Sequence, residues 1–166
     1  MAVLYLPVVF EKSALFAEAV FSFNAKNFMP VGNNPQAVRS IAGGFILWSG
    51  GGKDKPWEEG ALSATVSDPG VKVNHGWFRG GWWDPLTMAW KDVAAAACFD
   101  RAPYKEGGHS PGATLFVPLQ LAPGESKTVS LRLAWYVGQT NLRIGKNVST
   151  DGPAENHRPW YAQRFT

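Results

Sequence analysis

One serine hydrolase pattern occurs in the sequence, and its chemistry fails at the residue after the serine. Gly108, Ser110 and Gly112 satisfy the G-x-S-x-G spacing of a nucleophile elbow. In that elbow the next residue donates its backbone N–H to the oxyanion, but here it is Pro111, which has no N–H. The motif also precedes an apolar run typical of a strand, whereas the elbow requires a helix there. We therefore expect no catalysis by Ser110.

The other residue types that do chemistry are dispersed along the chain. Asp84, Asp92 and Asp100 lie beside aromatic residues and could form the carboxylate pair of a glycoside hydrolase, but helix capping and a polar helix face explain the first two better. The three histidines do not have metal-ligand spacing, and the single cysteine, Cys98, can form neither an internal disulfide nor a cysteine zinc site. We predict no catalytic residue, no metal and no cofactor in this chain.

A stretch rich in aromatic residues is the strongest candidate for a functional site. Residues 76–85 hold four aromatic side chains, one arginine and three glycines. Aromatic faces can stack on sugar rings or pack under a partner domain, and Arg79 can bind hydroxyls or a carboxylate. The alternative is that these rings fill the core. Because adjacent side chains of a strand point to opposite faces, we expect at least one of Trp82 and Trp83 to be exposed.

Composition and charge limit the class of protein. The chain has 166 residues, 45% of them hydrophobic, which suits one domain with its own core. Its 18 Gly and 12 Pro against 17% charged residues favour short strands joined by tight turns. The net charge is +3, and lysine and arginine never occur three in a row, which argues against a nucleic-acid partner. No apolar run reaches transmembrane length, so we expect a soluble protein of the bacterial cytoplasm or periplasm.

Period-two alternation predicts several strands. Apolar and polar residues alternate over residues 17–29, which predicts a half-buried strand, and residues 1–10, 44–48, 61–66 and 71–77 are further candidates. The last of these follows Asp68-Pro69-Gly70, where we predict a type II turn.

One helix and one hairpin complete the expected elements. Asp84 as N-cap and Pro85 at the first position predict a helix over residues 85–93, followed by a possible strand over 94–99. Residues 114–121 and 128–136 alternate on either side of a Pro-Gly turn and predict an antiparallel hairpin, with Trp135 in the core. Its apolar face needs a second sheet to cover it. We therefore predict an all-β, antiparallel two-sheet β-sandwich over residues 1–137.

Several segments together resemble a known family. They are residues 21–28, residues 77–90, the Pro-Gly-Glu sequence at 123–125 that leads to Leu133-Ala134-Trp135-Tyr136, and the closing residues 159–165. In this order they resemble the N-terminal β-sandwich of glycoside hydrolase family 116, which contains β-glucosidases and the non-lysosomal glucosylceramidase. The resemblance extends over most of the chain.

The resemblance implies a role without catalysis for this chain. In that family the sandwich precedes a helical barrel domain, which carries the nucleophilic Glu and the acid/base Asp of a retaining mechanism, and no motif of that domain occurs here. Residues 138–166 are then a linker toward the helical catalytic domain, which is the expected partner, together with its carbohydrate or glycolipid substrate. The expected interface or ligand residues are Trp77, Phe78, Arg79, Trp82, Trp83, Asp84, Trp160, Tyr161 and Arg164.

Two other readings stay open from the sequence. The chain could be a free-standing carbohydrate-binding module that uses Trp82 and Trp83 as a sugar platform. It could also be a small hydrolase with its own carboxylate pair.

Overall fold

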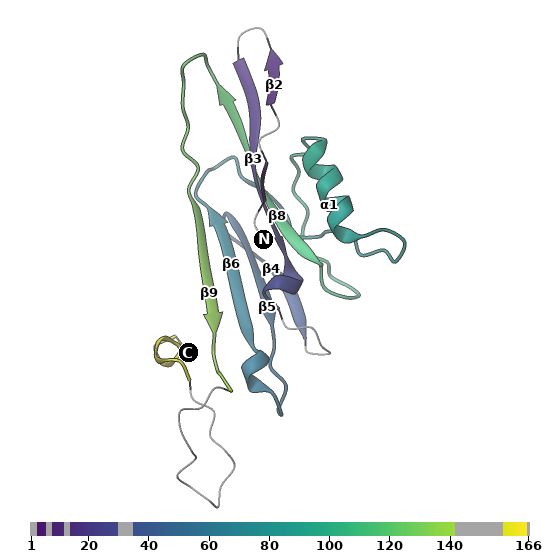
Figure 1. Ribbon diagram of the computed structural model, residues 1–166, viewed down its shortest axis with the longest axis vertical. Helices are drawn as coiled ribbons and strands as arrows, with labels where there is room; N and C mark the ends of the chain where they lie inside the picture. Colours follow the sequence, from purple (N-terminus) through teal and green to yellow (C-terminus); the bar gives the residue numbers. More distant parts are fainter. Residues whose placement is uncertain (1–2, 6–7, 12–13, 30–34, 142–157, 166) are drawn as a thin grey trace, which may run out of the picture.

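Two antiparallel β-sheets pack face to face in the computed structural model, which describes residues 3–5, 8–11, 14–29, 35–141 and 158–165 (Figure 1). In the first sheet, β1 (Val3–Tyr5) and β2 (Val8–Glu11) both pair with β3 (Ala14–Asn24), which is followed by β8 (Gly112–Leu121) and β7 (Lys72–Asn74). The second sheet has the order β4 (Gln36–Ile41), β5 (Gly44–Ser49), β6 (Gly60–Val66) and β9 (Leu131–Val137). The predicted two-sheet sandwich is confirmed.

The helical segments are short. Among the described residues they are one α-helix, α1 (Pro85–Ala94), and the 3-10 turns η1 (Ala25–Asn27), η2 (Pro56–Glu58) and η3 (Trp160–Gln163). Within the described part of the chain, no helix is long and apolar enough to cross a membrane.

The main core lies between the two sheets. Inward-facing residues of β6 alternate with less buried ones, and Leu62, Ala64 and Val66 are all buried. They pack in one cluster with Leu115 and Val117 of β8. The rings of Phe23 and Phe45 meet edge to face across the two sheets, with centroids 5.8 Å apart. The inner faces of the two sheets therefore meet through apolar side chains at every second position of their strands.

A second apolar cluster lies on the outer face of the first sheet. Figure 1 shows α1 on the side of β3 and β8 that faces away from β6 and β9. Val93 of α1 packs there against Val20 and Phe116, with Cys98 beside them. The strand predicted over residues 17–29 is present as β3, which ends at Asn24. It is not half-buried along its whole length: Glu18, Ala19 and Val20 are consecutive and all buried, because α1 covers the outer face of the sheet there.

Helix α1 begins as predicted. The Asp84 carboxylate accepts hydrogen bonds from the Thr87 amide and hydroxyl, both at 3.1 Å, and Pro85 takes the first helical position. No strand follows over residues 94–99. The chain instead turns at Ala96, whose φ of 51° ends the helix in the left-handed region.

The predicted hairpin between residues 114–121 and 128–136 does not form. Strand β8 pairs with β3 on one side and with β7 on the other, while β9 pairs with β6 in the opposite sheet. The β7 pairing extends only over Thr114, Leu115 and Phe116 of β8, and the segment of residues 122–130 crosses from one sheet to the other. Amphipathic alternation is the same for strands that pair and for strands that face each other, so the pattern could not tell the two apart.

The two Pro-Gly turns have types that the sequence did not distinguish. At Ala122-Pro123-Gly124-Glu125, Gly124 has a φ of 80° and the Glu125 amide donates to the Ala122 carbonyl, which is a type II turn. At Asp68-Pro69-Gly70 the predicted type II turn is wrong, because Gly70 does not have a positive φ. The Asp68 carboxylate accepts instead from the Gly70 amide at 2.8 Å.

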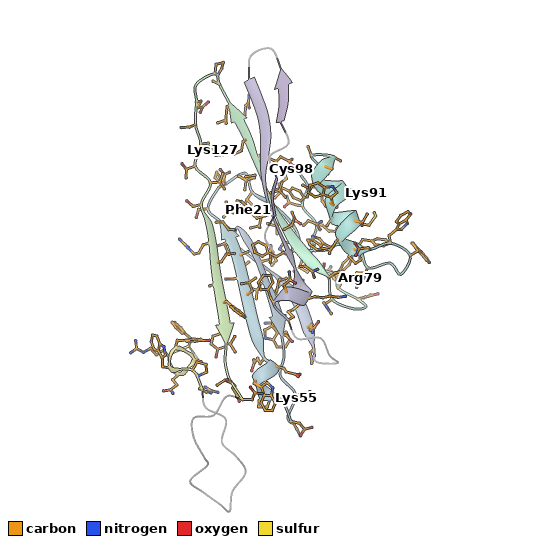
Figure 2. All side chains as sticks on the ribbon, viewed as in Figure 1. Phe21, Lys55, Arg79, Lys91, Cys98 and Lys127 are labelled. Carbon is orange, nitrogen blue, oxygen red and sulfur yellow. The ribbon has the colours of Figure 1, made fainter. Side chains whose placement is uncertain are left out.

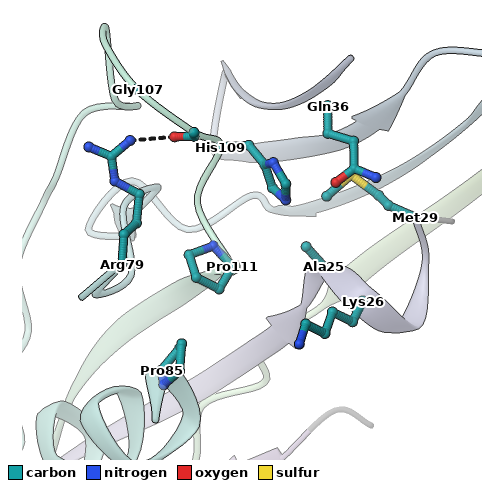
Figure 3. Close-up of a pocket in the computed structure, with 10 residues that line it drawn as sticks. Ala25, Lys26, Met29, Gln36, Arg79, Pro85, Gly107, His109 and Pro111 are labelled. Carbon is teal, nitrogen blue, oxygen red and sulfur yellow. Dashed lines mark hydrogen bonds between the residues drawn. The ribbon is translucent and has the colours of Figure 1, made fainter. Parts of the chain in front are cut away.

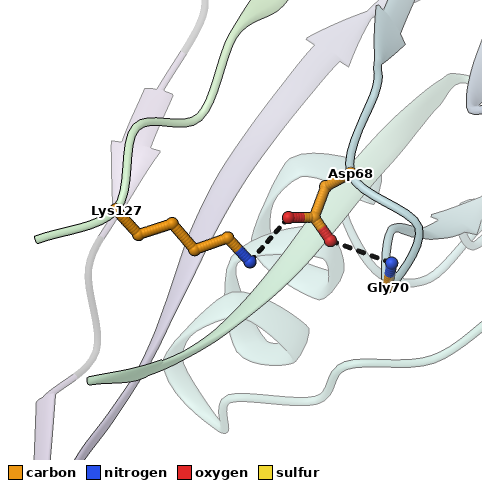
Figure 4. A network of polar contacts seen from close by, with 3 residues as sticks. All are labelled: Asp68, Gly70 and Lys127. Carbon is orange, nitrogen blue, oxygen red and sulfur yellow. Dashed lines mark hydrogen bonds and ion pairs between the residues drawn. The ribbon is translucent and has the colours of Figure 1, made fainter. Parts of the chain in front are cut away.

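An ion pair ties the crossing segment to this turn. Lys127 lies 2.6 Å from Asp68, whose other carboxylate oxygen is the one bound by the Gly70 amide (Figure 4). The Lys127 contact and the Gly70 amide lower the pKa of Asp68. The contact joins the end of β6 to the segment that leads into β9.

Trp135 is not in the core, contrary to its predicted position. It pairs with Leu62 and so lies on the same face of the second sheet as the core, yet 66% of it is exposed, as is 50% of Leu133. Strand β9 is the edge of its sheet, and no described strand of the opposite sheet covers this part of it. Position at an edge, rather than alternation, decides its exposure.

Glu18 is a buried acid on the outer face of the first sheet. One of its carboxyl oxygens, Oε2, has no hydrogen-bond partner. Burial raises the pKa of Glu18, opposed by a hydrogen bond with Cys98 and by the charge of Lys72. Burial and the neighbouring Glu18 carboxylate raise the pKa of the Cys98 thiol to about 11 (Figure 2).

We expect Glu18→Gln to stabilise the protein at neutral and alkaline pH. A carboxyl whose pKa is raised by folding favours the folded state while it is protonated, and this contribution is lost as the pH rises through the folded-state pKa. Glutamine keeps the shape without the buried charge. Thermal unfolding should therefore give a higher Tm for Glu18→Gln than for the wild type at pH 8, and the difference should shrink toward pH 4.

Glu59→Gln is the matched control, because Glu59 is exposed just before β6. It should change Tm little at either pH. An equal Tm for Glu18→Gln and wild type at pH 8 would contradict the buried charge.

Candidate functional site

Four large apolar side chains on α1 or directly before it are exposed, and we call them the α1 aromatic surface. They are Trp82, Trp83, Leu86 and Trp90, which are 84%, 55%, 49% and 49% exposed. Both adjacent tryptophans are exposed, as the sequence led us to expect for at least one of them. Leu86, Ala89, Trp90 and Val93 recur at helical spacing, but only Ala89 and Val93 are buried.

The geometry of α1 explains this division. The helix lies against the outer face of the first sheet through Ala89 and Val93. Leu86 and Trp90 are one turn apart and flank this contact line, so they form a single apolar ridge. The Asp84 cap fixes the direction in which the chain enters the helix, and the Thr87 amide lowers the pKa of that carboxyl. The Lys91 ammonium lies 4.8 Å from the centroid of the Trp83 ring.

An apolar groove runs beside this ridge. It has a volume of about 360 Å³ and lies between α1 and the first sheet. Its lining residues are Ser22, Trp77, Asp84, Leu86, Thr87, Ala89, Trp90 and Val93. The two groups in it with the most hydrogen-bonding capacity, Asp84 and Thr87, are bonded to each other in the helix cap.

Trp77 is a core residue and not part of the exposed surface, which corrects its place among the candidate site residues. It is 3% exposed, and its indole N–H donates to the Thr114 hydroxyl at 2.9 Å. A Cβ on Gly112 would lie 2.5 Å from the Trp77 ring, so glycine is required there for the indole to fit. Trp77 therefore forms the floor of the groove.

Ser110 has a structural role that accounts for the false hydrolase pattern. It is 2% exposed, and its hydroxyl oxygen accepts the Trp77 amide at 2.8 Å and donates to the Gly112 carbonyl at 2.5 Å. The serine and the second glycine of the pattern thus hold Trp77 in place.

Arg79 and Phe78 do not line the groove. Arg79 contacts the loop of residues 104–108 instead. The Arg79 guanidinium stacks on Tyr104, 3.6 Å from the ring centroid, and donates to the backbone carbonyls of Glu106 and Gly108. Phe78 is half-buried, and its ring folds back over Gly80. Arg79 thus belongs to a second region, beside the α1 aromatic surface.

The candidate residues of the C-terminal tail lie on the other side of the molecule. In Figure 1 the tail lies beside β9, across the sandwich from α1. The Tyr161 hydroxyl donates to the Val137 carbonyl at 3.2 Å, and the Tyr161 ring contacts Tyr136. Trp160 is 71% exposed, and the Arg164 guanidinium lies 5.5 Å from its ring centroid. The nine candidate residues therefore do not form one continuous site.

Several of the acids and histidines that are dispersed in the sequence interact with neighbouring groups within the described residues. Asp100 accepts the Val73 amide at 2.7 Å, and burial raises the pKa of Asp92, opposed by the charge of Arg101. The ring nitrogens of His75 face the carbonyls of Arg101 and Gly44. The described residues include no group of three or more His, Cys, Asp or Glu that could hold a metal ion, and His157 lies outside them.

Comparison of the chain with protein families, with curated proteins and with solved structures finds no match. The candidate site is therefore described by its geometry alone.

We expect the tryptophans of this region to differ sharply in their contribution to stability. Trp77→Ala removes a buried ring and its hydrogen bond, and should cost about 3 to 5 kcal/mol in the free energy of unfolding. Trp82→Ala should change it by less than about 0.5 kcal/mol, because the ring is exposed. Urea denaturation of the two variants measures this difference.

Trp135→Ala provides a second comparison. Because its ring is exposed, this substitution should also change the free energy of unfolding little. A loss for Trp82→Ala as large as that for Trp77→Ala would show that the α1 aromatic surface is part of the core.

Proposed function

We propose that this chain is a non-catalytic β-sandwich of a retaining glycoside hydrolase of the β-glucosidase and glucosylceramidase type, and that its α1 aromatic surface packs on the helical catalytic domain. The family assignment rests on the resemblance of the sequence segments described above. The docking role rests on the α1 aromatic surface.

The observation that carries the docking role is the exposure of tryptophan. Five of the eight tryptophans are at least 49% exposed, three of them on or beside α1. Leu86 and Trp90 lie one helical turn apart, and exposed apolar surface of this kind marks interaction sites on soluble proteins. Tryptophan is also the residue type that contributes most often to the energetic centre of a protein interface.

The chemistry of the groove favours a protein partner over a sugar. Sugar recognition needs polar side chains that can pair with hydroxyl groups, in addition to an aromatic face. In the groove beside α1, Asp84 and Thr87 already pair with each other, and the other lining groups are mostly apolar. A carbohydrate-binding module remains the second candidate, because Trp82 at 84% exposure could serve as a stacking platform.

The experiment is calorimetric titration of this chain with the helical catalytic domain produced separately. We expect measurable association, and we expect the double variant Trp82→Ala/Trp83→Ala to weaken it at least tenfold, in keeping with the loss of interface tryptophans. Trp135→Ala is the control, because it removes an exposed tryptophan of β9, which lies on the other side of the sandwich from α1 and is not among the expected interface residues.

Two further measurements test the alternatives. The isolated chain should not hydrolyse a nitrophenyl β-glucoside. It should also show no saturable change in tryptophan fluorescence with cellobiose. Saturable sugar binding that is lost in Trp82→Ala would replace the docking role with the carbohydrate-binding module.

A further inference from the structure

A second cavity, larger than the groove beside α1, opens at the N-terminal end of that helix. It has a volume of about 660 Å³, within the range of small-molecule sites. Three separate segments form it: η1 with the start of β4, the N-terminus of α1 with Arg79, and the loop of residues 107–111 (Figure 3). We call it the 107–111 cleft.

The walls of the cleft divide into an apolar floor and polar side chains. Ala25, Met29, Pro85 and Pro111 supply the apolar part. Figure 3 shows the side chains of Lys26, Gln36 and His109 entering the cleft from different segments. This is the composition of a site for an organic molecule: an apolar surface for its body and a few polar groups that fix its orientation.

The charged side chains that line the cleft are positive. Lys26 and Arg79 line it, and none of the described residues that line it carries a carboxylate. Residues 30–34, which lie in the sequence between Met29 and Gln36, also contain no Asp or Glu. Asp84 is near enough for the charge of Lys26 to lower its pKa, but it does not line the cleft. The cleft therefore disfavours cations and favours an anion.

The loop that carries His109 is held in place before any ligand arrives. Arg79 binds the carbonyls of Glu106 and Gly108, and its guanidinium is stacked on Tyr104. Gly107 has a φ of 76°, and a Cβ there would lie 3.1 Å from an Arg79 nitrogen. A site that is formed in advance does not lose the entropy of ordering a loop when it binds.

We propose that the 107–111 cleft binds a small organic oxyanion with an apolar body, and that Lys26 and His109 contact its charged group. Arg79 acts as a positioning residue, because its contacts hold the loop of His109. The cleft is separate from the α1 aromatic surface, so a test of anion binding does not depend on the docking role.

The experiment is an NMR titration of the isotope-labelled chain with benzoate, phenyl phosphate and uncharged benzamide. We expect saturable shifts of the amides of Lys26 and His109 with at least one of the two anions, and none with benzamide at the same concentrations. The comparison of benzoate with phenyl phosphate identifies which oxyanion the cleft prefers.

Variants separate a built site from general attraction to a basic protein. Lys26→Met should weaken binding of the preferred anion about fivefold, by the loss of one charged contact, and His109→Ala should weaken it as well. Lys53→Met removes the same charge from an exposed position that does not line the cleft, and should leave affinity unchanged. Both lysines are exposed, so both variants should unfold at the wild-type temperature.

Three results would overturn the proposal. They are no saturable shift with either anion, equal binding of benzamide, and an equal effect of Lys26→Met and Lys53→Met on affinity.

Discussion

Strand β8 is buried on both faces, and the rest of the molecule is arranged around that requirement. Residues 112–117 are all buried, because Leu115 and Val117 face the second sheet while Thr114 and Phe116 face the layer of α1. A strand in that position needs hydrogen-bonding partners on both edges, since unpaired backbone groups in a dry interior are costly. β3 pairs along all of β8, and β7 pairs with Thr114, Leu115 and Phe116 in its buried half. β9 pairs with β6 and completes the other sheet.

The outer layer follows from the same requirement. A helix must cover Val20 and Phe116, and α1 does so with its narrow stripe of Ala89 and Val93. That stripe is too narrow to bury the larger side chains beside it, which leaves Leu86 and Trp90 exposed. The exposure of Leu86 and Trp90 thus follows from the packing of a short helix on the outer face of a sheet whose inner face is already covered.

The start of β8 also joins the two candidate sites. Ser110 and Gly112 hold Trp77 under the groove beside α1, while Gly108 and the Arg79 that binds it border the cleft on the other side of the same loop. The α1 aromatic surface and the 107–111 cleft therefore share one support. The tail with Trp160 has a different support, the outer face of β9 at Tyr136. Because these supports lie on opposite sides, a single flat partner cannot cover both.

The sequence by itself determined the local features. Alternation located the apolar face of β8, and the Asp84-Pro85 pair located the start of α1, because each depends only on neighbouring residues. Trp82 and Trp83 are both exposed, but they lie in a bend before α1 and not on a strand, so the alternation from which the exposure of one of them was expected does not apply.

Only the tertiary structure decided which strands pair and which residues are covered. The strand at residues 114–121 and the strand at 128–136 carry the same alternation whether they pair or face each other, so their placement in opposite sheets depends on β3 and β7, which lie far away in the chain. Trp77 and Trp135 were misplaced for the same reason. One is covered by the start of β8 and the other sits at a sheet edge, and burial depends on distant segments that local spacing does not record.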